Sequence, residues 1–242
     1  MPAVLVHGVP DTYRMWDRVR SHLGRADVIA LSMPGFDAEA PPNFDASKEA
    51  YVDWLVGELD RVGVRVDLVG HDWGSILVQR AAALRPHLIR TLACGSGPAD
   101  REYVWHDMAQ LWQTPGVGEE VMAGFTPEAT AAALAEQTDT EAAREMADYI
   151  DDDMKRCILA LYRSAVNVGE EWEDSVAAVG GQFPALVLWG RDDPYVQPEF
   201  GERLAKRLNA RLVMFDDSGH WWPYTKPREV AAALEELWES AR

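Results

Sequence analysis

Gly70-His71-Asp72-Trp73-Gly74 is the stretch that decides the fold of this chain. It has the Gly-x-nucleophile-x-Gly spacing of a nucleophile elbow, with an aspartate at the central position. A β-branched apolar run at residues 64–69 precedes it, and an amphipathic segment at residues 75–84 follows it. The flanking glycines allow a tight turn from strand to helix that exposes the central side chain. Taken alone, the pentapeptide is equally compatible with an ordinary turn, since Gly and Asp are common turn residues.

Two later segments favour the elbow. Residues 186–194, Leu-Val-Leu-Trp-Gly-Arg-Asp-Asp-Pro, have the pattern of a buried strand that ends in an acidic loop. Residues 212–220 have the pattern of another strand, whose following loop ends in a histidine. Nucleophile, acid and histidine follow one another in the chain order of the α/β-hydrolase triad, each just after a predicted strand.

On these motifs the chain resembles the α/β-hydrolase family, and within it the branch of epoxide hydrolases and haloalkane dehalogenases that use an aspartate nucleophile. His7-Gly8-Val9-Pro10, directly after the apolar residues 3–6, is similar to the His-Gly-x-Pro oxyanion motif of that family. The resemblance covers almost the whole chain and is weakest between residues 98 and 180. Family members usually carry two more strands ahead of this motif, so the resemblance implies a sheet that is shorter at this edge.

Composition agrees with a soluble enzyme that has one large core. The chain has 242 residues, of which 48% are hydrophobic, and no apolar run approaches the ~20 residues needed to span a bilayer. We expect no signal peptide, because the N-terminus has no basic segment followed by an apolar stretch. Cys94 and Cys157 are too few for a disulfide framework and predict a reducing cytoplasmic location. The net charge of −17 argues against nucleic acid and anionic membranes as partners.

Strand and helix signals alternate along most of the chain, which indicates βαβ crossovers and a mostly parallel sheet. Ligands of such sheets bind beyond the carboxyl ends of the strands, where all four motifs fall. Before residue 98 we expect further strands at residues 3–7, 27–31 and 88–94, and helices at residues 12–24 and 46–62.

The alternation stops between residues 98 and 180, where the pattern is helical at residues 129–134, 141–150 and 155–166. An insertion at this point resembles the helical cap of the family. We therefore predict an α/β-hydrolase core at residues 1–97 and 181–242, with a cap at residues 98–180. A cap over the elbow would exclude water and strengthen the electrostatic interactions beneath it.

The resemblance implies a two-step reaction that starts at Asp72. Its carboxylate would attack an sp³ carbon and form a covalent ester. His220 would then activate the water that hydrolyses the ester, with Asp193 orienting the imidazole and stabilising its cation. Asp193 matches the Gly-x-x-Asp spacing that follows the strand, and Asp192 is the alternative if the register is shifted by one residue.

The remaining parts of the expected site are backbone groups. The N–H groups of Val9 and Trp73 would form the oxyanion hole as the ester breaks down. No His or Cys pattern has the spacing of a metal site, so we expect neither a metal nor a cofactor. The expected partners are a small apolar electrophile and water, and the sequence does not specify an oligomeric state.

The leaving group depends on the cap. Epoxide hydrolases supply cap tyrosines to the developing alkoxide, and Tyr162 resembles the second of these in its placement before Asp193. The alternative for Tyr162 is a core tyrosine that only packs. The first cap tyrosine has no clear match, since Tyr103 lies early and Tyr149 lies late, and we assign Tyr149 to substrate binding.

Tryptophans would serve a dehalogenase instead, by donating indole N–H groups to a halide. Trp73 and Trp112 are the candidate substrate-binding residues of this kind, with Trp105 as a further option. Val9 lacks the side-chain donor that many haloalkane dehalogenases carry at this position, and Trp73 replaces the arginine typical of haloacetate dehalogenases. Epoxide hydrolysis is therefore the favoured function, with haloalkane or haloacid dehalogenation as the alternative. A non-enzymatic small-molecule binder remains a second alternative, because fold does not fix function.

Overall fold

Six short apolar segments pair into one parallel sheet in the computed structural model, which describes residues 1–241. Every pairing in this part of the chain is parallel, and the order across the sheet is β2-β1-β3-β4-β5-β6. The strands are β1 (Ala3–Val6), β2 (Val28–Leu31), β3 (Val66–His71), β4 (Ile89–Gly95), β5 (Ala185–Gly190) and β6 (Arg211–Phe215). The predicted α/β-hydrolase fold class is thereby confirmed.

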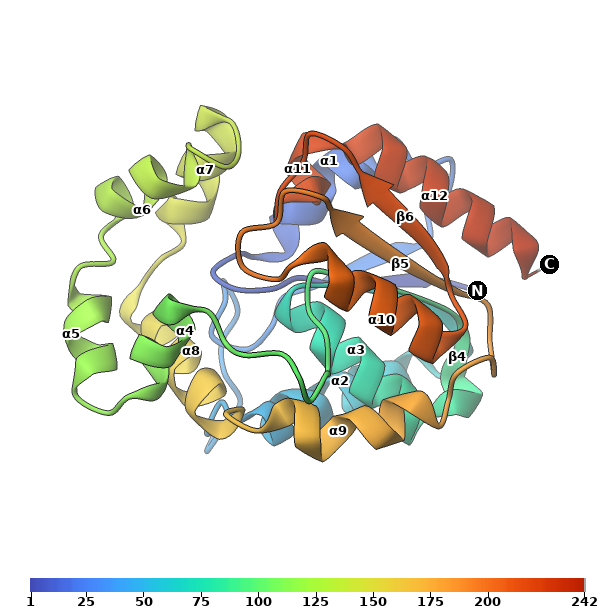
Figure 1. Cartoon of the computed structure of the whole chain (residues 1–242), viewed down its shortest axis with the longest axis horizontal. Helices are drawn as coiled ribbons and strands as arrows, with labels where there is room; N and C mark the ends of the chain where they lie inside the picture. The colour runs from blue at the N-terminus through green and yellow to red at the C-terminus, as the bar shows by residue number, and fades with distance from the viewer. Residues whose placement is uncertain (242) are drawn as a thin grey trace.

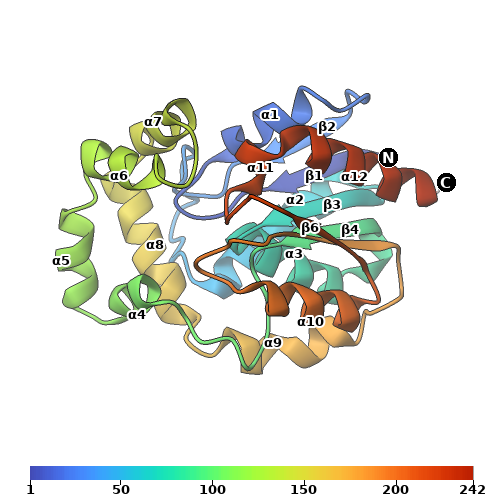
Figure 2. The same ribbon diagram turned by 45° about the horizontal axis from the view of Figure 1, so that its top comes forward.

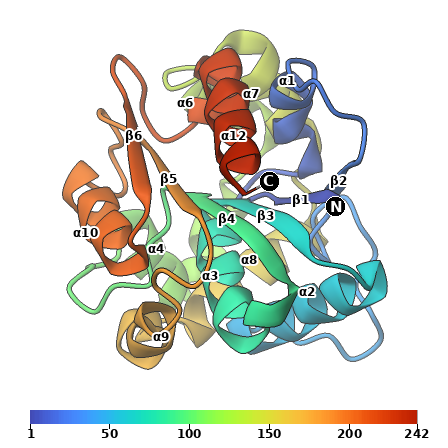
Figure 3. The same ribbon diagram turned by 90° about the vertical axis from the view of Figure 1, so that its right-hand side faces the viewer.

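Helices cover both faces of the sheet, as the view along its edge shows (Figure 3). One layer contains α1 (Asp17–Arg20), α11 (Trp222–Thr225) and α12 (Pro227–Ser240). The opposite layer contains α2 (Lys48–Val62), α3 (Trp73–Leu84), α9 (Val168–Ala177) and α10 (Pro198–Leu208). Two 3-10 helices, η1 (Tyr13–Trp16) and η2 (Pro86–Leu88), lie in the connections.

The alternation of side chains along the strands creates two hydrophobic cores. Val4 and Val6 of β1 pack with the layer of α2 and α3, whereas Ala3 and Leu5 pack with the layer of α1 and α12. Such a division follows from the two-residue period of a strand, which sends neighbouring side chains to opposite faces. The central strands β3 to β5 are almost entirely buried, because helices cover both faces of the sheet. Only the edge strand β2 is half-exposed among the first five strands.

The helix expected at residues 12–24 is shorter in the structure. It consists of η1 followed by the single turn of α1, which ends at Arg20. The segment then continues through two exposed residues to Gly24, whose N–H donates to Glu235 of α12. Residues 21–24 therefore form part of the connection from α1 to β2, which contacts α12, and not a last helical turn.

Between β4 and β5 the chain forms an all-helical insertion beyond the carboxyl ends of the strands (Figure 1, Figure 2). Its first helices are α4 (Asp107–Gln113), α5 (Val117–Ala123), α6 (Pro127–Leu134), α7 (Thr140–Asp148) and α8 (Asp152–Ser164). The last helix, α9, packs instead against α3 and α10 in the layer beneath the sheet. The expected boundary at residue 180 therefore includes in the insertion one helix, α9, that packs against the core helices α3 and α10.

Candidate active site

Asp72 lies at the sharp turn between β3 and α3. Its φ angle is +53°, a left-handed conformation that is unusual for a residue with a side chain and that aims the carboxylate out of the end of the sheet. The two flanking glycines permit this turn. A Cβ on Gly70 would lie 2.3 Å from the carbonyl oxygen of Gly74, so only glycine allows the strand and helix to approach this closely.

Asp72, His220 and Asp193 form a connected set at this edge. His220 Nε2 lies 3.4 Å from Asp72 Oδ2, and His220 Nδ1 lies 2.9 Å from Asp193 Oδ2. The other oxygen of Asp193 accepts hydrogen bonds from the backbone N–H groups of Tyr195 and Val196, each at 3.0 Å. These contacts fix the carboxylate that orients the imidazole.

Asp192 has a different environment from its neighbour Asp193. It is exposed, whereas Asp193 is buried against His220. In the structure it is therefore Asp193 that contacts the imidazole, at the register expected from the Gly-x-x-Asp spacing.

The charges of the three groups support one another. Burial alone would lower the pKa of His220, but the carboxylates of Asp193 and Asp72 outweigh it and raise this pKa to about 10. Burial alone would raise the pKa of Asp72, but the hydrogen bond and positive charge of His220 hold it below its usual value. At neutral pH the free protein thus holds an imidazolium between two carboxylates.

The backbone of Val9 faces the nucleophile. Its N–H donates to Asp72 Oδ1 at 2.7 Å, the distance of a charge-assisted hydrogen bond. A Cβ on the preceding Gly8 would lie 2.3 Å from the same oxygen, so glycine is required for this approach. Trp73 is the first residue of α3, where a backbone N–H has no acceptor within its own helix. The Val9 N–H thus contacts the Asp72 carboxylate, and the Trp73 N–H follows Asp72 directly along the chain with no acceptor inside α3.

Two neutral histidines support this arrangement. His7 accepts from the N–H of Met33 at Nε2 and contacts the Gly8 carbonyl at Nδ1, which fixes the loop that carries Val9. His71 contacts the His220 carbonyl through Nε2 at 2.8 Å. Burial lowers the pKa of each of these imidazoles to about 4, so both are neutral at pH 7. They hold loops in place and leave His220 as the charged imidazole beside Asp72.

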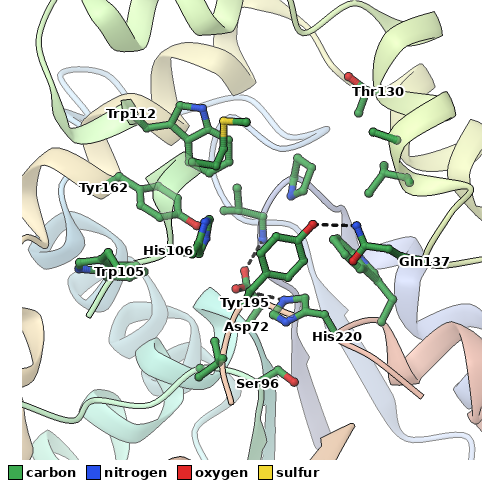
Figure 4. A pocket seen from close by; sticks show the side chains of 18 of the residues that line it. Asp72, Ser96, Trp105, His106, Trp112, Thr130, Gln137, Tyr162, Tyr195 and His220 are labelled. Atoms are coloured by element: carbon green, nitrogen blue, oxygen red, sulfur yellow. Dashed lines mark hydrogen bonds and ion pairs between the residues drawn. The ribbon is translucent and has the colours of Figure 1, made fainter. Parts of the chain in front are cut away.

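A cavity of about 300 Å³ opens above the Asp72 carboxylate (Figure 4). Asp72 and His220 form its floor, and α4 to α6 supply apolar walls that include Met108, Trp112 and Phe125. Apolar walls with a few polar groups are typical of a small-molecule site. The cavity therefore suits a mainly apolar ligand with one reactive polar centre.

Tyr162 of α8 projects into this cavity with its hydroxyl towards the space above Asp72 (Figure 4). Three indole rings surround its ring, with centroid distances of 5.3 Å to Trp73, 5.1 Å to Trp105 and 4.9 Å to Trp112. Burial raises the pKa of the Tyr162 hydroxyl well above its usual value, and the nearby Asp72 carboxylate adds to this shift. Tyr162 is consequently a neutral O–H group in the free protein.

The tryptophans differ in what their indole N–H groups do. Trp105 donates to the Ala165 carbonyl at 3.2 Å, so its N–H is already used within the fold. Trp73 and Trp112 are buried and, within residues 1–241, their Nε1 atoms have no acceptor. Trp112 lines the cavity, whereas Trp73 lies behind it, stacked against Trp105.

Tyr149, which was expected to bind substrate, lies away from this cavity. Its ring lies over the guanidinium of Arg14, 4.2 Å from ring centroid to Cζ, and the residue does not line the cavity. Tyr149 directly follows α7, on the side that faces η1. Its position in the sequence does not determine the direction in which its side chain points.

Three other cavity residues were not predicted from the sequence. Tyr195 follows the acid in the loop after β5, and Gln137 lies between α6 and α7, where its Nε2 donates to the Tyr195 hydroxyl at 2.8 Å. His106 caps α4 by accepting from the Ala109 N–H at Nδ1. The sequence signal available for Tyr195 was the Asp-Pro-Tyr-Val turn that begins at the acid. In such an Asx turn the backbone N–H groups of the following residues donate to the carboxylate, which fixes their positions.

Neither of the serines near the elbow takes the place of the nucleophile. Ser75 donates to the Gly97 carbonyl at 2.7 Å on the buried side of α3. Ser96 accepts from the indole N–H of Trp222 at 3.1 Å, and His220 contacts Asp72 instead. Elsewhere in residues 1–241, no group of three or more His, Cys, Asp or Glu side chains has a metal-binding arrangement, and no helix is long and apolar enough to cross a membrane.

Comparisons with known proteins place this geometry in context. The sequence model of the alpha/beta hydrolase family matches residues 3–233. The (E)-2-((N-methylformamido)methylene)succinate hydrolase of Acinetobacter baylyi is 23% identical over 97% of this chain and 89% of its own length. Epoxide hydrolase A of Mycobacterium tuberculosis is 26% identical over 97% of this chain and 89% of its own length.

Among solved structures, a loop variant of the haloalkane dehalogenase DbeA from Bradyrhizobium elkanii superimposes with a TM-score of 0.78. The match covers 99% of this chain and 91% of that protein, at 22% identity. At this identity the structural match shows a shared fold and does not identify the leaving group.

Proposed function

The chain belongs to the alpha/beta hydrolase family, and on that premise we propose that it opens epoxides to diols through a covalent ester on Asp72. The observation that carries the proposal is the position of a carboxylate at the elbow, with Oδ1 bonded to the Val9 N–H and Oδ2 facing His220. A carboxylate in this place forms esters by attack on an sp³ carbon. The epoxide hydrolase among the relatives supports the same substrate class.

In the first step Asp72 Oδ2 attacks one epoxide carbon, and the bond from that carbon to the ring oxygen breaks. The ring oxygen takes the proton of the Tyr162 hydroxyl, which leaves a hydroxyalkyl ester and a tyrosinate. Asp72 Oδ1 stays on the Val9 N–H and becomes the carbonyl oxygen of the ester. The buried, neutral hydroxyl of Tyr162 suits this role, because it adds no charge to the cavity before the reaction.

Before the second step the imidazolium proton of His220 passes by way of solvent to the tyrosinate, which restores the Tyr162 hydroxyl and leaves His220 neutral. His220 then takes a proton from water, and the resulting hydroxide attacks the Asp72 carbonyl carbon. The oxyanion forms on Oδ1, where the N–H groups of Val9 and Trp73 stabilise it. The hydroxyl proton of this intermediate passes to the leaving alkoxide oxygen, so collapse releases the diol and restores the Asp72 carboxylate beside the imidazolium of His220. Asp193 stabilises the imidazolium through its 2.9 Å contact with Nδ1.

Conversion of Asp72 to an ester would itself make His220 a base. In the free protein two carboxylates raise the pKa of His220 to about 10, which keeps it protonated. The ester is neutral, and the tyrosinate of the first step is reprotonated by His220, so one of the two carboxylate charges beside the imidazole is gone before hydrolysis and the pKa of His220 is lower. The histidine therefore gains its basic form at the stage that needs it.

The helices α4 to α8 would act as the cap of this site. Their side chains cover Asp72 and provide the apolar cavity walls, which lowers the effective dielectric around the reacting charges. In this proposal the cap ends at α8, and α9 belongs to the α/β core against which it packs.

Dehalogenation is the second candidate, and the free indole N–H groups of Trp73 and Trp112 favour it. Both rings pack on Tyr162, so a small movement of this cluster would present two N–H donors to a halide. A halide leaves without a proton and would not need the Tyr162 hydroxyl. The two reactions share the ester on Asp72 and differ in the group that leaves.

A parallel assay separates the two functions. The purified protein is incubated with aryl and alkyl epoxides and with bromoalkanes of matched size, and diol formation and bromide release are measured. We expect diol formation to exceed bromide release and to disappear in Asp72→Asn. Faster bromide release than epoxide opening would replace the proposal with dehalogenation, and no turnover of either class would favour a binding protein.

A further inference from the structure

Tyr195 occupies a position at the reacting centre that the reaction above leaves without a function. It belongs to the loop between β5 and α10, two residues after Asp193, and its side chain lines the cavity beside Asp72 and His220 (Figure 4). Tyr162 reaches the same space from α8. The two tyrosines therefore come from different parts of the molecule, one from the α/β core and one from the insertion.

The Tyr195 ring is held on several sides. Edge-to-face contacts join it to His106, His220 and Trp221, with centroid distances of 5.0, 5.2 and 5.7 Å. Its backbone N–H donates to Asp193, which fixes the start of the side chain. The hydroxyl consequently has a defined position relative to the Asp72–His220 pair.

The hydrogen bond from Gln137 decides which way the Tyr195 proton points. Gln137 Nε2 donates to the phenol oxygen at 2.8 Å, so this oxygen acts as an acceptor on the side of Gln137. A phenol O–H lies in the ring plane and takes one of two orientations. With one side occupied by a donor, the proton is directed to the other side, away from Gln137 and into the cavity. Burial raises the pKa of Tyr195, which keeps that proton in place at neutral pH.

Tyr103, the third tyrosine that lines the cavity, has no hydroxyl proton directed into it. The Tyr103 hydroxyl donates to the Tyr195 backbone carbonyl at 3.3 Å, so its proton is used within the protein. This contact further fixes the loop that carries Tyr195. Of the three tyrosines that line the cavity, Tyr195 and Tyr162 are accordingly the two whose hydroxyls can donate into it.

We propose that Tyr195 is a second catalytic proton donor, positioned by Gln137, which together with Tyr162 binds the epoxide oxygen as the ring opens. Two hydroxyls donate to one oxygen, and the proton of either can move to it when the carbon–oxygen bond breaks. The other hydroxyl remains as a hydrogen-bond donor to the new alcohol. The inference rests on the proposed function, since a halide would need no such proton.

The test measures alkylation alone, in a His220→Gln background where the ester is expected to accumulate. The rate of mass increase is followed by intact-mass spectrometry with a small aryl epoxide and with a bromoalkane of similar size. Tyr195→Phe keeps the ring and removes the hydroxyl, so alkylation by the epoxide should fall roughly 10- to 100-fold, the scale of one hydrogen bond to a developing charge. Alkylation by the bromoalkane should be unchanged. Tyr149→Phe, whose hydroxyl lies outside the cavity, is the matched control and should behave as the parent.

Two substitutions of Gln137 test the positioning role. In Gln137→Glu the new carboxylate can only accept, so it should turn the Tyr195 proton away from the cavity and slow epoxide alkylation as much as Tyr195→Phe does. Gln137→Leu removes the donor but leaves the proton free, so its effect should be smaller even though the change in shape is larger. A purely structural role of Gln137 predicts the opposite order.

The outcomes separate this inference from the proposed function. If the parent background forms no epoxide ester, the proposed function fails. If it forms the ester while Tyr195→Phe alkylates at the same rate, Tyr195 is not a donor and the inference is overturned. An equal loss with epoxide and bromoalkane would likewise overturn it, because the substitution would then have disturbed the site as a whole.

Discussion

The loops of the sheet and the helices above them contribute different chemistry to the same cavity. The loops after β3, β5 and β6 carry Asp72, Asp193 and His220, which bear the charges of the site. The described helices α4 to α8 and the turns between them add aromatic, aliphatic, hydroxyl and amide groups to the cavity wall and no Asp, Glu, Lys or Arg. The one imidazole they add, His106, has its pKa lowered by burial and is neutral at pH 7.

The difference between the core loops and the insertion shows which part of the fold can carry charged groups. The β3 elbow is fixed by strand pairing and by close glycine contacts, so Asp72 cannot move away from His220. A charged group on the insertion would have to be buried against apolar neighbours, at a high cost in desolvation. In the proposed reaction the insertion would therefore shape the cavity and donate neutral hydrogen bonds, while the core would carry out the covalent steps.

The largest effect on turnover is expected when the charge of the proposed nucleophile in the core is removed. Asp72→Asn should reduce turnover by on the order of 10⁶-fold, the scale seen when a covalent nucleophile is lost, because an amide does not attack the epoxide carbon. Diol formation by freshly purified protein measures the effect, before slow deamidation can restore the aspartate. Asp192→Asn is the matched control, since Asp192 is exposed and should be replaceable without loss. Full activity of Asp72→Asn would transfer the nucleophilic role to another residue.

Removal of the neutral donor of the insertion should have a smaller and more selective effect. Tyr162→Phe retains the ring among its three tryptophans but loses the O–H group. Epoxide alkylation should fall about 10²- to 10³-fold, as when one oxyanion donor is removed, and halide displacement should change much less. Single-turnover rates with both substrates measure this difference. Equal epoxide turnover by Tyr162→Phe and the parent would remove Tyr162 from the reaction.

The rates of alkylation and of ester hydrolysis should depend differently on pH, and these changes in rate should be smaller than those caused by the two substitutions. Alkylation needs the Asp72 carboxylate, whose pKa lies below its usual value, so its rate should be constant from pH 5 upward. Ester hydrolysis needs neutral His220, whose pKa is about 10 in the free protein and falls when Asp72 becomes neutral. Hydrolysis should therefore speed up as pH rises, by at most about tenfold per pH unit, until the pH passes that lowered pKa.

Stopped-flow fluorescence can follow both phases through Trp112 and Trp221, which line the cavity. A hydrolysis phase that is independent of pH between 5.5 and 9 would mean that His220 does not act as the base in the second step. An alkylation phase that slows as the pH falls from 7 to 5.5 would mean that the Asp72 carboxylate is not held in its charged form.

The core could be predicted from the sequence because its signals are local. Each predicted strand is a short apolar run, and the elbow, the acid and the histidine lie at fixed distances from the strand ends. Parallel pairing then brings these ends to one edge of the sheet, so sequence spacing was sufficient to place Asp72, Asp193 and His220 together.

The cavity wall could not be predicted in the same way. The direction of a side chain on the insertion depends on how each helix packs, and spacing along the chain does not determine it. Tyr149 was expected in the cavity and lies on Arg14, whereas Tyr195 was overlooked because it comes from the core loop and not from the insertion. Its partner Gln137 is distant in sequence, so the hydrogen bond that orients the Tyr195 hydroxyl appears only in the folded chain.

The most direct test of the account is the mass of His220→Gln after brief exposure to an epoxide. Asp72 should still be alkylated while the ester is no longer hydrolysed, because nucleophile and base act in different steps. A mass increase equal to one substrate should accumulate on the protein and map to the peptide that contains Asp72. A variant that binds the epoxide as the parent does but stays unmodified, or that carries the adduct on another residue, would contradict the account.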